Sequence, residues 1–311
     1  MLLSIVTPTR GNFSDYWIEQ LTAVQGDVEF VLVYPPGQPI RELSDPRIKI
    51  IVCPFKAELI QRSIGLMNAM GEYVLALDDD DFLHPQVTDL IKSYFDLYPD
   101  SLCLRLKKKN ISYKDTELIK RDWDKLPDLS SLIVADERVE RGKYTRDKIL
   151  QKLPIAPLEN PFKMTALLPY GKRTDQNGYH PENYNNMVWK NHITKTALED
   201  LLRFTKSLGP FAYIPFWSLD RLLSLYIQAQ YFEKGGFIGH WLRDVEQVRY
   251  IQMMPIQKGE VRYEHGGDLI LALRFPQYGY FWNLFAYGMW FTIKAFVRNS
   301  YGSIRRVFSG K

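Results

Sequence analysis

The sequence predicts an α/β fold in which a mostly parallel sheet carries helices on both faces. Over the first hundred residues, short apolar runs bounded by Pro, Gly or Asp alternate with stretches of helical spacing. The chain has 311 residues with an apolar fraction of 46%, enough to bury a sizeable core. Alternation of this kind is typical of parallel strands whose carboxyl ends meet at one edge, where ligands bind.

The elements follow in order from local composition. Strands are expected at 2–7, 29–34, 48–53 and 73–77, where the runs are short and rich in β-branched residues. Helices are expected at 15–24, 57–70 and 85–98, and later at 193–205 and 219–230, where apolar residues recur with helical spacing. Thr7, Tyr34 and Asp78 fall at strand carboxyl ends, so we expect them to meet at one crevice.

Changes in composition suggest four regions. Residues 1–106 form the ligand-binding half just described, and 107–192 are a charged, loop-rich insertion or lid that begins with Lys107, Lys108 and Lys109. Charged runs are more often solvated than functional, so we expect a solvated face there. Region 193–272 is a second helical half, and 273–311 is an aromatic and basic tail.

Charge and cysteine content exclude some classes of protein. A net charge of +4 does not indicate an extended nucleic-acid surface, so no nucleic-acid partner is expected. Cys53 and Cys103 lie in apolar runs, which indicates buried free thiols and a reducing, cytoplasmic compartment. The apolar N-terminus has no basic leader and is expected to be the first strand rather than a signal peptide.

Four consecutive aspartates, Asp78 to Asp81, follow the predicted strand at 73–77. Carboxylates about 4 Å apart repel by about 4 kcal/mol at an effective dielectric constant of about 20. A divalent cation would offset this repulsion, because such ions prefer hard oxygen ligands. The alternative is that Asp80 or Asp81 only caps the following helix.

Three segments together resemble a known family. They are Ser4-Ile5-Val6-Thr7-Pro8-Thr9-Arg10, the helix-to-strand stretch at 61–73, and Leu77-Asp78-Asp79-Asp80-Asp81-Phe82-Leu83-His84-Pro85. They are similar to the nucleotide-binding half of glycosyltransferase family two, which has the Rossmann-type GT-A fold. The resemblance implies a metal-dependent enzyme that moves a sugar, with inversion, from a nucleotide diphosphate sugar to an acceptor hydroxyl, using Mn²⁺ or Mg²⁺.

The resemblance also implies roles for individual residues. The metal would be held by Asp80, the last member of the Asp-x-Asp motif. The family's acidic base-binding residue after the second strand is missing, and Tyr34 stands there as a candidate to stack on the base. Arg62 either reaches the same pocket or is a surface arginine on an amphipathic helix. The remaining donor-site candidates are Thr7, Pro8, Thr9, Arg10, Asp78 and Asp79.

The resemblance makes 193–272 the acceptor half and 107–192 an insertion and acceptor-side region. A general base is expected in the acceptor half at the start of a later helix, as in the family. Asp220 is the candidate, with Ser218 as the predicted N-cap, although Leu219 replaces the family's usual glutamate. Stabilisation of the helix dipole is the alternative role for Asp220, and Asp200 is the second candidate for the base. His265 lies in a segment similar to the family's late histidine, which contacts metal or diphosphate; otherwise it is an exposed turn residue.

The tail is the second informative feature. Nine aromatic residues lie in 278–297, followed by several arginines. As a helix, this segment would place Asn283, Tyr287, Lys294 and Arg298 on a polar stripe opposite a broad apolar face, which suits a membrane interface. Spanning the bilayer, docking on its own domain and docking on a second subunit are the alternatives.

These patterns favour a glycosyltransferase that acts in the cytoplasm, and the tail favours a peripheral position on the inner face of the membrane. Its expected partners are a nucleotide diphosphate sugar and a glycan or lipid-linked acceptor of cell-surface glycan synthesis. A non-catalytic nucleotide-sugar-binding or membrane-attached scaffold on a degenerate transferase fold is the alternative. A nucleotidyltransferase ranks last, because the expected Gly- and Lys-rich phosphate loop is not evident near the N-terminus.

Overall fold

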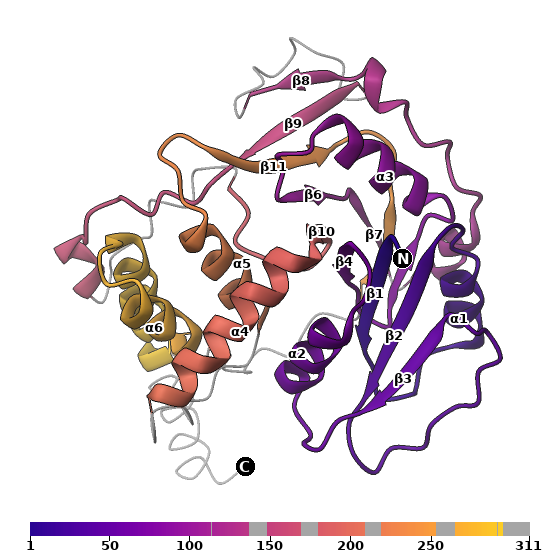
Figure 1. The fold of residues 1–311 in the computed structure, drawn as a ribbon, viewed down its shortest axis with the longest axis horizontal. Coiled ribbons are helices and arrows are strands. Elements are labelled where there is room, and N and C mark those ends of the chain that lie inside the picture. Colours follow the sequence, from indigo (N-terminus) through magenta and orange to yellow (C-terminus); the bar gives the residue numbers. More distant parts are fainter. Residues whose placement is uncertain are drawn as a thin grey trace, which may run out of the picture.

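The computed structural model describes residues 1–112, 114–136, 148–168, 180–208, 219–252, 265–290 and 292–294. Within them, nine strands form the main sheet in the order β3-β2-β1-β4-β10-β6-β11-β9-β8 (Figure 1). A smaller sheet of three strands has the order β5-β12-β7. The predicted α/β class and mostly parallel sheet are confirmed.

The first half of the main sheet is the part that the sequence predicted. Its parallel strands are β1 (Leu3–Pro8), β2 (Val28–Tyr34), β3 (Ile48–Val52) and β4 (Tyr73–Ala76). Leu3 is in register with both Val28 and Tyr73, so the carboxyl ends of β1, β2 and β4 emerge at one edge. Every residue of β2 is buried because both faces of the sheet are covered.

The second half of the sheet was not predicted. It contains β6 (Cys103–Arg105), β8 (Ile133–Ala135), β9 (Ile149–Pro154), β10 (Met187–Lys190) and β11 (Phe237–Leu242). Strand β10 inserts between β4 and β6, antiparallel to both. Strands from the region 107–192 thus complete the main sheet. The boundaries at 106, 192 and 272 remain predictions.

The small sheet joins the aspartate loop to the charged stretch. Strand β12 (Val248–Gln252) lies between β5 (Asp81–Leu83) and β7 (Lys108–Ser112). Strand β5 begins at the last of the four aspartates. The lysine run therefore lies partly in an ordered strand, and the small sheet holds Lys108 near Asp81.

Helices cover both faces of the main sheet. On one face are α1 (Asp15–Thr22) and α3 (Val87–Leu97); on the other are α2 (Glu58–Asn68), α4 (Asn191–Ser207), α5 (Leu219–Gln230) and α6 (His265–Arg274) (Figure 1). Helix α1 begins where the Ser14 side chain accepts the N–H of Trp17. In the part of the chain that the structure describes, three short 3-10 helices cover Thr116–Lys120, Leu129–Ser131 and Met164–Leu167. The predicted helices are confirmed to within a few residues.

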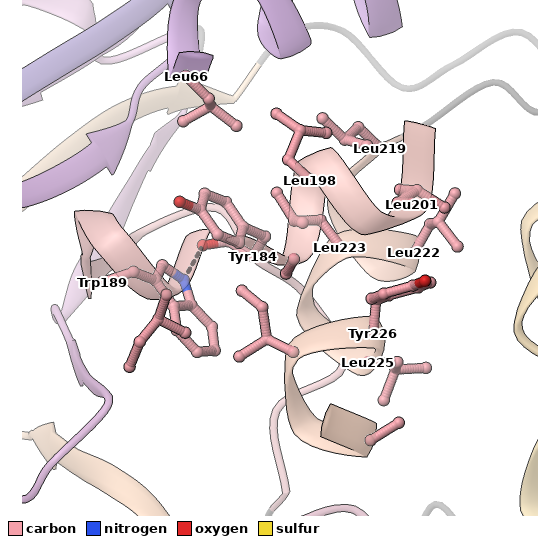
Figure 2. Close-up of a cluster of buried hydrophobic side chains, with 14 of the residues drawn as sticks. Leu66, Tyr184, Trp189, Leu198, Leu201, Leu219, Leu222, Leu223, Leu225 and Tyr226 are labelled. Atoms are coloured by element: carbon pink, nitrogen blue, oxygen red, sulfur yellow. Dashed lines mark hydrogen bonds between the residues drawn. The ribbon is translucent and has the colours of Figure 1, made fainter. Parts of the chain in front are cut away.

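One apolar core fixes the start of α5 against the sheet (Figure 2). Leu219 and Leu223 of α5 are buried in it. The rings of Tyr184 and Trp189 stack with centroids 5.3 Å apart, and Trp189 Nε1 donates to the Tyr184 carbonyl at 3.2 Å. Packing at this point holds the chain just before β10 beside the first turn of α5.

The aromatic tail is helical over 279–290 and packs on the protein itself. Tyr280, Phe281 and Leu284 are buried. Asn283 is also buried, where its side chain accepts the N–H of Lys163 at 2.8 Å and donates to the Pro161 carbonyl at 3.1 Å. Asn283 therefore does not belong to a solvent-facing polar stripe, and that part of the expectation was wrong.

Two other expectations concern membrane spans and thiols. Among the described residues, no helix combines the length and the apolar character needed to cross a membrane. Cys53 and Cys103 are free and buried, as predicted.

Candidate active site

A large cleft opens along the carboxyl-end edge of the main sheet, with a volume of about 1830 Å³. One side, the β1–β4 wall, is lined by Pro8, Thr9, Arg10, Asp78, Asp79 and Asp80. Across the cleft, the β6–β11 wall is lined by Arg105, Leu106 and Trp241. Residues 180–183 and 185–187 and Asp220 of α5 also line it. The parallel strands bring their ends to one crevice, as the sequence predicted.

The β1–β4 wall is held by hydrogen bonds between its two loops. Thr9 Oγ1 donates to Asp79 Oδ2 at 2.7 Å and accepts the N–H of Gly11 at 3.0 Å. Gln61 of α2 donates to the carbonyl of Val33 at 2.6 Å. Burial raises the pKa of Asp79, while the Thr9 hydroxyl acts in the opposite direction. The Asp79 carboxylate is thus hydrogen-bonded to the loop after β1.

Two predicted residues do not reach the cleft surface. Thr7 and Tyr34 are fully buried, and the lining comes from the residues that follow them, Pro8 and Pro35. The Tyr34 ring packs against Gly11, whose positive φ of 79° suits glycine. The ring therefore offers no exposed face on which a base could stack.

Arg62 links the two sides of the site. The residue is 4% exposed, so it is not a surface arginine. It donates to Asp78 Oδ1, to Asn185 Oδ1 at 3.0 Å, and to Glu58 Oε1 at 3.0 Å. Burial disfavours its charge, but Asp78 and Glu58 favour it, and the net effect raises the pKa of Arg62.

Asp220 lies in the first turn of α5 and reaches the same network. Its Oδ1 accepts the backbone N–H of Asn185 at 2.6 Å. Burial raises the pKa of Asp220, while the backbone N–H of Asn185 and the charge of Arg62 act in the opposite direction. A half-buried carboxylate with a raised pKa that lines a cleft has the properties of a general base.

Asp200, the second candidate for the base, has a different environment. It accepts the Tyr226 hydroxyl at 2.7 Å and a guanidinium N–H of Arg274 at 3.0 Å. It is absent from the cleft lining. Asp200 therefore ties α4 to α5 and α6, which is a structural role.

The aspartate loop offers oxygen ligands for a metal ion. Asp78, Asp80 and Asp81 each place one carboxylate oxygen within 4.8 Å of the others. Asp81 was not among the predicted ligands; it is 2% exposed, and Lys108 Nζ lies 2.7 Å from its Oδ1. This all-oxygen donor set fits a hard divalent cation.

Two of these carboxyl groups, those of Asp80 and Asp81, have raised pKa values. Burial and the charge of Asp78 raise the pKa of Asp80 to about 6, although Lys108 acts against the shift. Burial raises the pKa of Asp81 to about 7 despite its ion pair with Lys108. Carboxylates that resist ionisation in this way would be relieved by a bound cation.

Several cleft residues were missed by sequence reasoning. Lys108 belongs to a charged run that was expected to be solvated, but it lines the cleft. His180 and Glu182 contact Tyr280 of the tail helix: His180 Nε2 lies 3.0 Å from its hydroxyl, which donates to Glu182 at 2.7 Å. No local sequence signal separates these residues from ordinary loop residues. The side chain of His265 and all of Ser218 lie outside the described residues.

Comparison with known proteins finds one matching family model and several similar folds. Residues 36–162 match the sequence model of glycosyl transferase family 2. No curated protein gave a sequence match. Among solved structures, S. aureus TarS 1-349 in complex with UDP-GlcNAc is similar, with 13% identity and a TM-score of 0.51 over 89% of this chain and 66% of that chain.

Two further structures are more distant. TarS 1-349 in complex with UDP has 12% identity and a TM-score of 0.48, covering 89% of this chain and 65% of that one. The mannosyltransferase PcManGT from Pyrobaculum calidifontis, in complex with GDP-Man and Mn²⁺, has 11% identity and a TM-score of 0.39, covering 97% of this chain and 75% of that one. This chain spans slightly under two thirds of the TarS chains, and the likeness concerns the fold.

Proposed function

We propose that this chain, a glycosyltransferase of family 2 with the GT-A fold, transfers a sugar with inversion from a nucleotide diphosphate sugar to an acceptor hydroxyl. One observation carries the proposal. Arg62 donates to Asp78 on the β1–β4 wall and to Asn185, whose backbone N–H donates to Asp220. A donor-side carboxylate and a candidate base are thus held at one cleft by one network around the buried Arg62.

The base would be Asp220. The acceptor hydroxyl gives its proton to the Asp220 carboxylate as its oxygen attacks the anomeric carbon, and the nucleoside diphosphate leaves. The hydrogen bond from Asn185 holds the carboxylate in one orientation, and burial keeps its pKa above the ordinary value. Attack from the side opposite the diphosphate inverts the anomeric centre.

The donor would lie along the β1–β4 wall, where a divalent cation, Mn²⁺ or Mg²⁺, would be held by Asp80 with an oxygen of Asp78 or Asp81. When bound, the cation would neutralise negative charge on the diphosphate. Asp79 would keep the loop after β1 in place through Thr9. Pro8, Arg10 and Pro35 would border the nucleotide.

The acceptor is proposed to be a glycan or lipid-linked precursor of cell-surface glycans, used at the inner face of the membrane. Six basic residues and no acidic residue follow Asp268 in the sequence. Trp290 Nε1 donates to the Leu167 carbonyl at 2.8 Å, which joins the tail to the 161–168 segment. Exposed apolar side chains lie on both: Met164 is 70% exposed and Ile293 40%. Exposed apolar side chains beside a C-terminal sequence rich in basic residues would suit anionic headgroups.

A second candidate is a scaffold that binds the donor without catalysis. It is favoured by the partners that Asp78 and Asp81 already have, namely Arg62 and Lys108. Those cations offset repulsion among the aspartates without any metal. Turnover separates the two candidates, because a scaffold would bind the nucleotide sugar and never release the nucleoside diphosphate.

The test begins with binding. Thermal unfolding is followed with uridine, guanosine, cytidine and thymidine diphosphates and their sugars, with and without Mn²⁺. Stabilisation by one nucleotide that needs Mn²⁺ identifies the donor class, because selective binding to the folded state raises its Tm. Release of nucleoside diphosphate from that sugar donor then supports the enzyme. If no nucleotide stabilises the protein, the proposal fails.

A further inference from the structure

The β6–β11 wall carries a cationic cluster that the proposed reaction does not use. Arg105 ends β6 and is in register with Trp241 of β11. The Arg105 guanidinium carbon lies 4.7 Å from the centre of the Trp241 ring, and that of Arg243 lies 4.9 Å from it. Both Arg105 and Trp241 line the cleft.

This cluster has no counter-charge within the described part of the chain. Arg243 donates to the neutral Gln151 amide oxygen at 3.0 Å, and neither Arg105 nor Arg243 forms an ion pair there. Buried arginines elsewhere are paired: Arg62 with Asp78, and Arg249 with Glu246. Trp241 Nε1 is also buried without a hydrogen-bond partner among the described residues.

Leaving these groups unsatisfied has a cost. Burial lowers the pKa of Arg105, since desolvation disfavours its charge. A buried indole N–H without a partner also loses the hydrogen bond that it would make with water. Together, a guanidinium and an indole N–H on one wall of a cleft are donors suited to an anion.

The position of the cluster separates it from the proposed donor site. Strand β10 lies between β4 and β6 in the sheet, so the cluster is on the far wall from Asp78 to Asp80. Lys108, another cation of the cleft, forms an ion pair with Asp81. The cleft between the two walls also contains Asp220, where the acceptor hydroxyl would be deprotonated.

We propose that Arg105 and Trp241 form a subsite for an anionic group, a phosphate or a carboxylate, carried by the acceptor. The planar guanidinium would bind two oxygens of the anion, and Trp241 Nε1 would donate to a third oxygen or share one of these two. Arg243, stacked on the same indole, adds positive charge beside it. This assignment rests on the proposed function for its acceptor role, but the anion site itself does not.

The test uses sulfate and glycerol 3-phosphate as probes, with glycerol as the neutral control and sodium chloride at matched ionic strength. Calorimetric titrations are made on protein saturated with Mn²⁺ and the nucleoside diphosphate that stabilises it most, so that the donor diphosphate site is filled. We expect both anions to bind the unchanged protein. Arg105→Gln should lower the affinity for both anions at least about tenfold, and Trp241→Phe should lower it by less.

Arg203→Gln is the charge-matched control, because Arg203 is exposed on α4 and absent from the cleft lining. It should bind the anions as the unchanged protein does. If Arg105→Gln misfolds, Arg105→Lys is used instead. It keeps the positive charge but lacks the paired guanidinium donors, and should give intermediate affinity. Equal affinity in the unchanged protein and in the Arg105 and Trp241 variants would overturn the anion site.

Two further outcomes separate the proposals. If nucleotide saturation abolishes anion binding, Arg105 serves the donor diphosphate and the acceptor assignment is wrong. If no nucleotide binds, the proposed function fails, and the titration is made on the free protein. Arg105-dependent binding there would keep the anion site and remove its acceptor role.

Discussion

The backbone N–H of Asn185 donates to Oδ1 of Asp220 at 2.6 Å. The side-chain oxygen of the same asparagine accepts from Arg62 at 3.0 Å, and Arg62 also donates to Asp78. Through this chain of contacts, the loop after β4 and the first turn of α5 are fixed relative to each other. Because this donor belongs to the main chain, replacing the Asn185 side chain by another that keeps the N–H leaves it in place, and the position of the Asp220 carboxylate depends on the fold of the 180–186 segment.

Replacing Asp220 tests its role as the base. For Asp220→Asn we expect donor binding to survive and transfer to fall by at least about 100-fold, since a general base contributes about that much or more. Rates of nucleoside diphosphate release and donor affinity are measured side by side. Asp200→Asn is the matched control on the neighbouring helix: it should keep the transfer rate and lower the Tm, because Asp200 binds Tyr226 and Arg274. Equal activity of the two variants would remove Asp220 from catalysis.

Arg62 is expected to matter for stability as well as for the site. Arg62→Met would leave Asp78 and Asp220 near each other without their shared cation. We expect the free energy of unfolding to fall by about 3 kcal/mol, the lower end for a broken buried pair, because Asp78 stays 40% exposed. Urea denaturation measures this change. Glu58→Gln, on the exposed arm of the same network, should cost about 1 kcal/mol or less, and a similar loss in both variants would contradict the argument.

The first half of the fold was predictable because local composition determines it. Strands β1 to β4 are apolar or β-branched runs with clear boundaries, and the aspartates directly follow the last of these runs. Strand β10 gave no such signal: Met187–Lys190 is four residues long and follows a loop rich in Asn and Tyr. Its pairing depends on β4 and β6, far away in the sequence.

The same limit applies to the site. Arg62 lies four residues after Glu58, which is the spacing of a surface ion pair on a helix. Its burial involves a contact with Asn185, 123 residues away in the sequence, which the local pattern around Arg62 does not reveal. From the sequence, Lys108 belongs to a run that is expected to be solvated. In the structure, β12 pairs with both β5 and β7, and this places Lys108 beside the aspartates. Long-range pairing decides which charged residues enter the cleft, and periodicity within one segment does not contain that information.

Metal binding is tested at Asp80, which lines the cleft beside two other aspartates. Asp80→Ala should lose the Mn²⁺-dependent stabilisation by nucleotide and the activity, while its Tm without ligand stays close to that of the unchanged protein. Differential scanning fluorimetry with and without chelator follows both. Asp96→Ala, an exposed carboxylate on α3, serves as the control and should respond to Mn²⁺ normally. Normal turnover of Asp80→Ala at saturating Mn²⁺ would show that the metal assignment is wrong.

Proton competition makes metal affinity depend on pH. Asp80 and Asp81 have folded-state pKa values of about 6 and about 7, so both are largely protonated below these values. A metal needs the ionised form, and the Kd for Mn²⁺ should therefore fall as the pH rises from 5.5 to 7.5. Calorimetry at several pH values, with proton release measured in buffers of different ionisation enthalpy, checks the sign. A Kd that does not change over this range would argue against these ligands.

The free energy of unfolding of the metal-free protein should fall as the pH rises, whereas the affinity for the metal should increase. Both carboxyl groups have folded pKa values above that of an unfolded aspartate, so the folded state holds their protons more tightly. Their contribution to stability is greatest at low pH and is lost as the pH rises from about 4 through 7. Asp81→Asn, which cannot ionise, should reduce this part of the pH dependence of the Tm. An unchanged slope in that variant would contradict the shifted pKa.

Membrane attachment is best tested by point variants. Deletion after Phe275 would remove Tyr280, Phe281 and Leu284 from the core, so loss of lipid binding in a truncated chain would be uninterpretable. Met164→Glu and Ile293→Glu change exposed side chains instead. We expect flotation with phosphatidylglycerol-containing vesicles, little with pure phosphatidylcholine, and a loss of flotation in both variants.

The control for these variants is Leu202→Glu on α4, which places the same charge at a leucine of similar exposure away from the tail. It should float as the unchanged protein does, because a specific surface is required and net charge alone is not. Gel filtration of the same samples distinguishes a second subunit from a lipid surface: a dimer that dissociates in Ile293→Glu without any vesicle binding would assign the surface to self-association. Flotation that is identical in all four proteins would show that this surface does not bind the membrane.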